Sequence, residues 1–78
     1  MLKYSRHSKR RMALYGISEE DIAVIVKDGQ KESLVQEGRV SFTWPLGGKF
    51  RFSVKVVGVE KGDDILVITA YPLRKGRG

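Results

Sequence analysis

The spacing of apolar residues changes once along this chain, at Gly29, and the change restricts the folds that the sequence can form. Before Gly29, apolar residues recur every three or four positions, as on one face of a helix. After it, they alternate with polar residues, as in strands. The first part predicts a helix over residues 5–15, with Ser5 as its N-cap and Gly16 just after its end. A second helix is predicted to begin at Ser18 and to close at Gly29.

The part after Gly29 predicts strands. The candidates are residues 31–36, which form a weak strand, residues 39–44, residues 50–59 and residues 65–71. Val57 and Val59 interrupt the alternation of the longest candidate, which indicates a bulge or a second buried face. We therefore expect an α+β fold in which two N-terminal helices pack on one face of a three- or four-stranded antiparallel sheet. The predicted core consists of Ile22, Ile25, Phe42, Phe52, Val54, Leu66 and Ile68.

The length allows one domain, because a chain of 78 residues forms only one modest core. We expect the domain to comprise residues 1–78, with a globular part over about 4–72 and a basic C-terminal tail at 73–78. The chain has no cysteine and one histidine, so neither a disulfide framework nor a zinc site of usual spacing is expected, and no cofactor is predicted. Its apolar runs are too short to span a bilayer, which predicts a soluble cytoplasmic protein.

The excess positive charge lies at the two ends of the chain. The net charge is +6, from 15 basic and 9 acidic side chains. Residues 1–16 carry five of the bases and residues 72–78 carry three, and neither segment contains an acid, whereas residues 17–71 have a net charge of −2. Basic segments without acids attract polyanions such as RNA. Such segments also occur as solvated helix faces, so charge alone leaves both interpretations open.

Several strings of residues resemble a known family. They are Tyr4-Ser5-Arg6-His7-Ser8, Arg11-Met12, Tyr15-Gly16-Ile17-Ser18-Glu19-Glu20-Asp21-Ile22, Asp28-Gly29 and Val67-Ile68-Thr69-Ala70-Tyr71-Pro72. Together they span roughly residues 4–72 and resemble domain-of-unknown-function family 4258. That family is grouped with the barnase, EndoU, colicin and RelE-like fold, whose better-known members are metal-independent endoribonucleases and often toxins. The resemblance implies a nuclease-like fold and a toxin-like protein.

Cleavage of RNA without a metal ion requires a base for the 2′-hydroxyl, positive charge near the phosphorus and a proton for the leaving oxygen. His7 is the candidate acid or base, because histidine titrates near neutral pH, and Arg11 lies one helical turn away. Thr69 and Tyr71 share one face of the last predicted strand and complete the candidate catalytic set. Each residue also has a structural interpretation, such as a packing histidine or ordinary strand formers.

Further basic side chains are candidates for contact with nucleic acid: Lys3, Arg6, Arg10, Arg51 and Lys55. The leading hypothesis is a protein that contacts RNA, with metal-independent cleavage as its activity. The alternative is a non-catalytic binding module for nucleic acid or for an acidic protein partner of the antitoxin type. The weak strand at residues 31–36 also leaves open a homodimer through a sheet edge. A membrane is not an expected partner, because the first predicted helix has only a thin apolar stripe.

Overall fold

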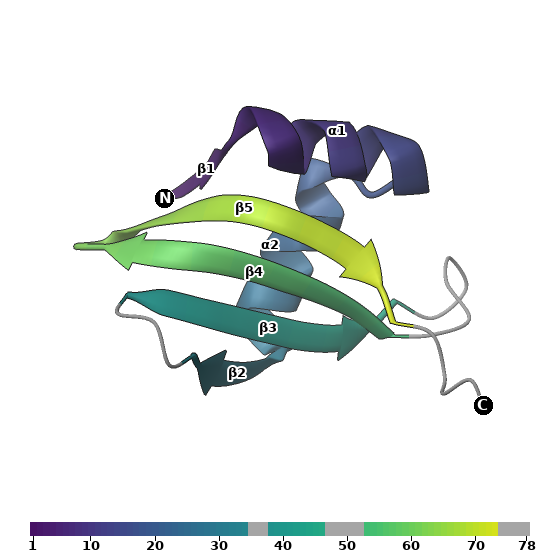
Figure 1. The fold of residues 1–78 in the computed structure, drawn as a ribbon. Helices are drawn as coiled ribbons and strands as arrows, with labels where there is room; N and C mark the ends of the chain where they lie inside the picture. The colour runs from purple at the N-terminus through teal and green to yellow at the C-terminus, as the bar shows by residue number, and fades with distance from the viewer. Residues whose placement is uncertain (35–37, 47–52, 74–78) are drawn as a thin grey trace.

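A computed structural model describes residues 1–34, 38–46 and 53–73 of the chain. The described residues form five strands and two helices, in the order β1 (Leu2–Tyr4), α1 (Arg6–Tyr15), α2 (Glu19–Asp28), β2 (Gln30–Ser33), β3 (Arg39–Pro45), β4 (Ser53–Lys61) and β5 (Asp64–Pro72) (Figure 1). The α+β class and the two N-terminal helices are as predicted. None of the helices in the described part of the chain is long and apolar enough to cross a membrane.

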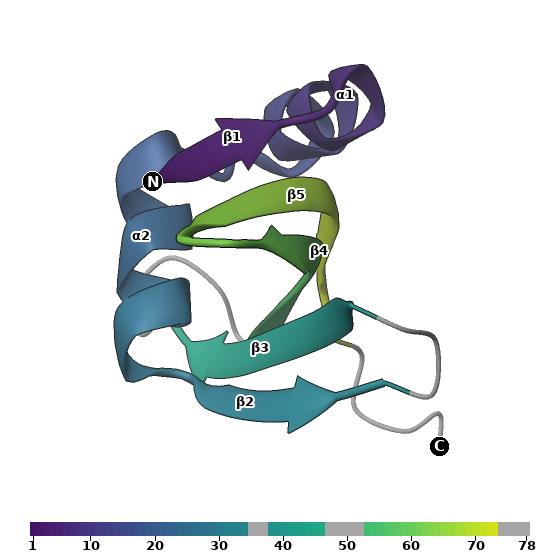
Figure 2. The same cartoon turned by 90° about the vertical axis from the view of Figure 1, so that its left-hand side faces the viewer.

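The strands form one mixed sheet with the order β1-β5-β4-β3-β2. The sheet is larger than the predicted three or four strands, and it is not wholly antiparallel, because β1 pairs in parallel with β5. Sequence periodicity missed β1, since three residues are too few to show an alternation. Helix α2 lies across one face of the sheet, and α1 continues from β1 along the β5 side (Figures 1 and 2). The face opposite α2 is called the open face below.

Both helices begin and end where the sequence predicts. The Ser5 hydroxyl accepts a hydrogen bond from the Ser8 amide at 3.0 Å, which caps α1, and Gly16 ends that helix with a φ of 70°. Ser18 and Asp21 form a capping box at the start of α2. Three carboxylates in the first turn of α2 add favourable charge at the positive end of the helix dipole.

The core lies between α2 and the sheet and is partly as predicted. Ile22, Ile25, Phe42 and Val54 are buried, and Phe52 lies outside the described residues. Leu66 and Ile68 are only half-buried, so their assignment to the core is wrong. The buried residues of β5 are instead Val67 and Ala70.

A bulge in β5 explains which residues of that strand are buried. Val57 pairs with Thr69 and Gly58 pairs with Val67, so Ile68 is an extra residue on β5. The irregularity expected at Val57 and Val59 therefore lies in the neighbouring strand, while β4 keeps its strict alternation. Gly58 allows the close approach, because a Cβ atom there would lie 2.9 Å from the Leu66 carbonyl oxygen.

Candidate functional site

The bulge in β5 determines the face on which two predicted site residues lie. Val67 faces the core, and an unbroken strand would place residues 69 and 71 on the same side as Val67. The extra residue, Ile68, reverses this pattern, so that Ala70 faces the core while Thr69 and Tyr71 point to the open face. Strand periodicity alone could not decide this orientation.

The same bulge is tied to the beginning of α1. The Ser5 amide donates to the Val67 carbonyl at 3.0 Å, and the Ser5 hydroxyl donates to the Ile68 carbonyl at 3.3 Å. Three residues further on, Ser8 is completely buried, and its hydroxyl donates to the Ser5 carbonyl at 2.8 Å. Because the Ser8 side chain is small and its hydroxyl is hydrogen-bonded, α1 can lie close to β5. The first turn of the helix is thereby placed beside Thr69.

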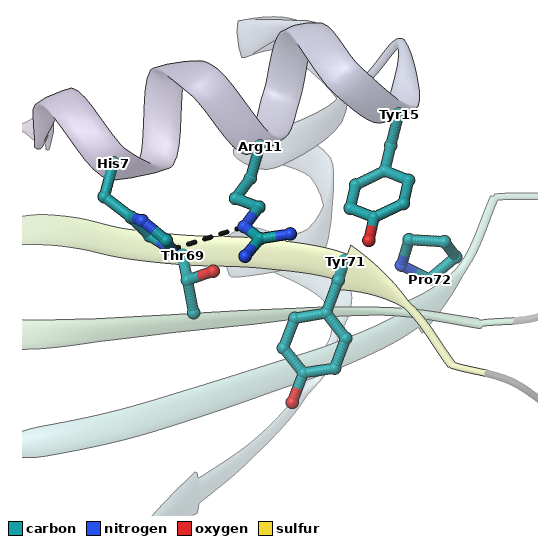
Figure 3. A pocket seen from close by; sticks show the side chains of 6 residues that line it. All are labelled: His7, Arg11, Tyr15, Thr69, Tyr71 and Pro72. Atoms are coloured by element: carbon teal, nitrogen blue, oxygen red, sulfur yellow. Dashed lines mark hydrogen bonds between the residues drawn. The ribbon is translucent and has the colours of Figure 1, made fainter.

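Helix α1 and the end of β5 enclose a pocket of about 310 Å³. Its lining residues are His7, Arg11, Tyr15, Thr69, Tyr71 and Pro72 (Figure 3). The four residues predicted as catalytic therefore line one pocket, although the pair His7 and Arg11 lies more than 50 positions from the pair Thr69 and Tyr71 in the sequence. The lining contains basic and phenolic side chains and no acid. Two other pockets, at β2 and β3, each include an acidic residue, Glu32 or Asp28.

His7 and Arg11 are hydrogen-bonded to each other inside the pocket. The Arg11 Nε–H donates to His7 Nε2 at 3.4 Å, and both side chains are largely exposed (Figure 3). The spacing of four residues puts both side chains on one edge of α1. The pair therefore offers one titratable ring and one permanent cation to the same small space.

Thr69 and Tyr71 contribute hydroxyl groups from the strand side of the pocket. In Figure 3 the Tyr71 ring extends from β5 away from α1, so its hydroxyl group is the end furthest from His7. Lys55 lies directly opposite Tyr71 in the β4–β5 register, on the same face of the sheet. A cation thus flanks the pocket on the open face, next to an aromatic ring.

The other predicted binding residues are more scattered. Arg6 and Arg10 are exposed on α1 but do not line the pocket. Lys3 lies near the other end of β5, where its ammonium group pairs with Asp64 at 3.4 Å. That ammonium group is the main reason why the pKa of the Asp64 carboxyl lies below its usual value. Arg51 lies outside the described residues.

Tyr15 packs against the core and also lines the pocket, and sequence reasoning did not include it among the site residues. The signal was present in the sequence, since His7, Arg11 and Tyr15 follow one another at intervals of four residues. Pro72, the last residue of β5, also lines the pocket.

Among the described residues, no group of three histidine, cysteine or acidic side chains could hold a metal ion. Comparison with known proteins finds no family model, no curated protein and no solved structure that matches this chain. The functional interpretation therefore rests on the pocket, and the family resemblance stays an expectation from the sequence.

Proposed function

We propose that the protein binds RNA in the α1–β5 pocket and that His7 and Arg11 act on its phosphodiester backbone without a metal ion. The observation that carries the proposal is the pairing of these two side chains in a pocket that has no acidic lining residue. A phosphate group entering the pocket meets a guanidinium group that can donate two parallel hydrogen bonds. The resemblance to a fold group rich in endoribonucleases supports the same assignment.

Each step of cleavage has a candidate residue. His7 Nε2 takes the proton of the 2′-hydroxyl, and the 2′-oxygen attacks the adjacent phosphorus. Arg11 stabilises the charge that builds on the phosphate oxygens, with Lys55 as a second cation on the open face. The bond to the 5′-oxygen breaks as that oxygen takes a proton, which leaves a 2′,3′-cyclic phosphate. The protonated His7, or the hydroxyl of Tyr71, supplies this proton.

One feature of the pocket favours a second candidate function, a non-catalytic binding module. The Tyr71 hydroxyl is directed away from His7, so Tyr71 does not place a proton donor close to His7 (Figure 3). A binding module needs only the cationic surface of α1 and the pocket, and its ligand is then RNA or an acidic protein segment. Cleavage assays separate the two functions.

The test of the enzymatic function uses purified protein, a set of varied single-stranded and structured RNAs, and a chelator. We expect cleavage by the unaltered protein and a loss of about 10²- to 10⁴-fold in rate for His7→Ala, the usual size of an acid–base contribution. Affinity for RNA should fall far less than the cleavage rate, and the melting temperature should stay nearly the same, because His7 is exposed. Tyr71→Phe keeps the ring and removes only the hydroxyl, so it isolates the contribution of that group.

The outcomes discriminate between the functions. Intact RNA together with salt-sensitive binding by the unaltered protein would establish the binding module and exclude the enzyme. Cleavage that persists in His7→Ala would show that His7 is not the acid or base.

A further inference from the structure

We propose that Arg11 controls the proton state of His7 and gives up its hydrogen bond to His7 when a phosphate group enters the pocket. The inference rests on the proposed function in one respect, namely that the ligand of the pocket is a phosphodiester. Arg11 is then a positioning residue for His7 as well as a ligand of the phosphate. The two events, anion binding and protonation of His7, become coupled.

The hydrogen bond between the two side chains favours one position for the proton of the ring. An arginine side chain stays protonated in proteins and can only donate hydrogen bonds. Because Arg11 Nε donates to His7 Nε2, that ring nitrogen must accept through a lone pair. In this contact the ring therefore carries its proton on Nδ1, and the unprotonated nitrogen faces Arg11.

This hydrogen bond is weak enough to be exchanged. Its length of 3.4 Å exceeds the usual range for N–H donors, and it joins two exposed side chains. The acceptor in this bond is an uncharged ring nitrogen, whereas a phosphate oxygen is negatively charged and can pair with the guanidinium group through two parallel hydrogen bonds. No acidic side chain lines the pocket, and Arg11 forms no ion pair with any described residue. A phosphate oxygen is therefore a better acceptor for Arg11 than His7 Nε2.

The exchange changes what His7 can do. Once Arg11 turns to the phosphate, Nε2 is free to take a proton, either from solvent or from the 2′-hydroxyl of RNA. A proton taken from solvent lets Nε2 donate to a phosphate oxygen. Binding of the anion and binding of the proton then strengthen each other, as linkage requires. Affinity for phosphate should rise as the pH falls through the range in which histidine titrates.

The charged groups around His7 are consistent with an affinity for phosphate that rises as the pH falls. The other ionisable groups of the pocket are Arg11 and Tyr15 on α1 and Tyr71 on β5. Lys55 on β4 flanks Tyr71, and Lys3 on β1 is paired with Asp64. The remaining charged side chains of α1 are Arg6, Lys9 and Arg10, which are all basic. An incoming anion is thus the one species at this site that favours a protonated imidazole.

The test is nuclear magnetic resonance of the His7 ring, which gives a single set of signals because the chain has one histidine. At pH 8 we expect the unaltered protein to carry the ring proton on Nδ1. Arg11→Gln should move a substantial part of the population to the Nε2–H form. Arg10→Gln removes the same charge from the neighbouring position outside the pocket and should leave the ring signals unchanged.

Inorganic phosphate and a DNA dinucleotide, which lacks the 2′-hydroxyl and cannot be cleaved, are then added to each protein. We expect the titration of the ring to move upward by about one pH unit, the effect of an opposite charge within hydrogen-bonding reach. The shift should be largest in the unaltered protein and Arg10→Gln, and much smaller in Arg11→Gln.

Three results would overturn the proposal. The first is an Nε2–H ring in the unaltered protein. The second is an Arg11→Gln variant whose His7 ring has the same tautomer as the unaltered protein, and the third is a His7 titration that neither anion shifts. If RNA binds and is cleaved while the ring gives any of these results, the coupling is wrong and the proposed function stands. If RNA also fails to bind, the proposed function fails with it.

Discussion

At the scale of single residues, Ser5 connects the start of α1 to the site. Its side chain caps the helix by accepting from the Ser8 amide, and it also donates to the carbonyl of the extra residue in the β5 bulge, Ile68. The capping role was predictable from the sequence, because serine before a helical stretch is a strong local signal. The link to β5 was not, since it depends on a bulge whose position is set by the pairing of distant strands.

We predict that Ser5→Ala lowers the free energy of unfolding by about 1 kcal/mol or slightly more, the usual cost of losing an N-cap. Urea denaturation measures this effect. Ser18→Ala is the matched control, because Ser18 caps α2 in the same way. Both variants should lose stability, but only Ser5→Ala should also shift the ring signals of His7. Equal His7 signals in the two variants would show that Ser5 does not position the site.

At the scale of elements, β1 is held to β5 by pairing and by charge. The Ser5 amide donates to the Val67 carbonyl just after the strand, and Lys3 and the chain amino group both lie near the Asp64 carboxylate. Sequence patterns identified both helices and the segments of β2 to β5. They could not identify β1, because its stability comes from its neighbours in the sheet and not from its own three residues.

The lowered pKa of the Asp64 carboxyl leads to a pH-dependent prediction. Because the pKa in the folded chain is below the ordinary value of 3.8, the charge interactions stabilise the fold above that value and are lost as the pH falls through the lower one. Asp64→Asn should therefore speed hydrogen exchange at the Ser5 and Ile65 amides near pH 6. The variant and the unaltered protein should converge at strongly acidic pH.

Lys31→Gln is the control for this experiment, because it breaks the Lys31–Glu60 ion pair from β2, the strand at the opposite edge of the sheet from β1. It should leave exchange at Ser5 and Ile65 unchanged. If the exchange rates of Asp64→Asn and the unaltered protein differed by the same factor at every pH, the charge on Asp64 would not be the cause of the difference.

The edge strand β2 bears on the predicted homodimer. Its four residues are all exposed and polar, and they include Lys31 and Glu32. A short edge strand with charged side chains is a common device against edge-to-edge pairing. The sheet-edge dimer therefore receives no support from the composition of this strand.

At the scale of the whole molecule, charge is divided between the two helices. Helix α1 carries Arg6, Lys9, Arg10 and Arg11 and no acid, whereas α2 carries four acids and one base. In Figure 2, α2 lies across one face of the sheet and α1 lies beside β1 and β5, where its basic side chains His7 and Arg11 line the pocket. The cluster of basic residues near the N-terminus of the sequence predicted the basic character of α1. Only the fold shows that the basic helix borders a pocket.

The central claim, that RNA binds along α1 and in its pocket, is tested most directly by the salt dependence of RNA affinity. The double variant Arg10→Ala/Arg11→Ala is compared with Lys27→Ala/Lys61→Ala, which removes the same charge from exposed positions outside the pocket. We predict weaker binding in the first variant and a salt slope that is flatter by about one unit for each lost phosphate contact, with little change in slope in the second. Unchanged affinity and slope in the first variant, or equal losses in both, would contradict the claim.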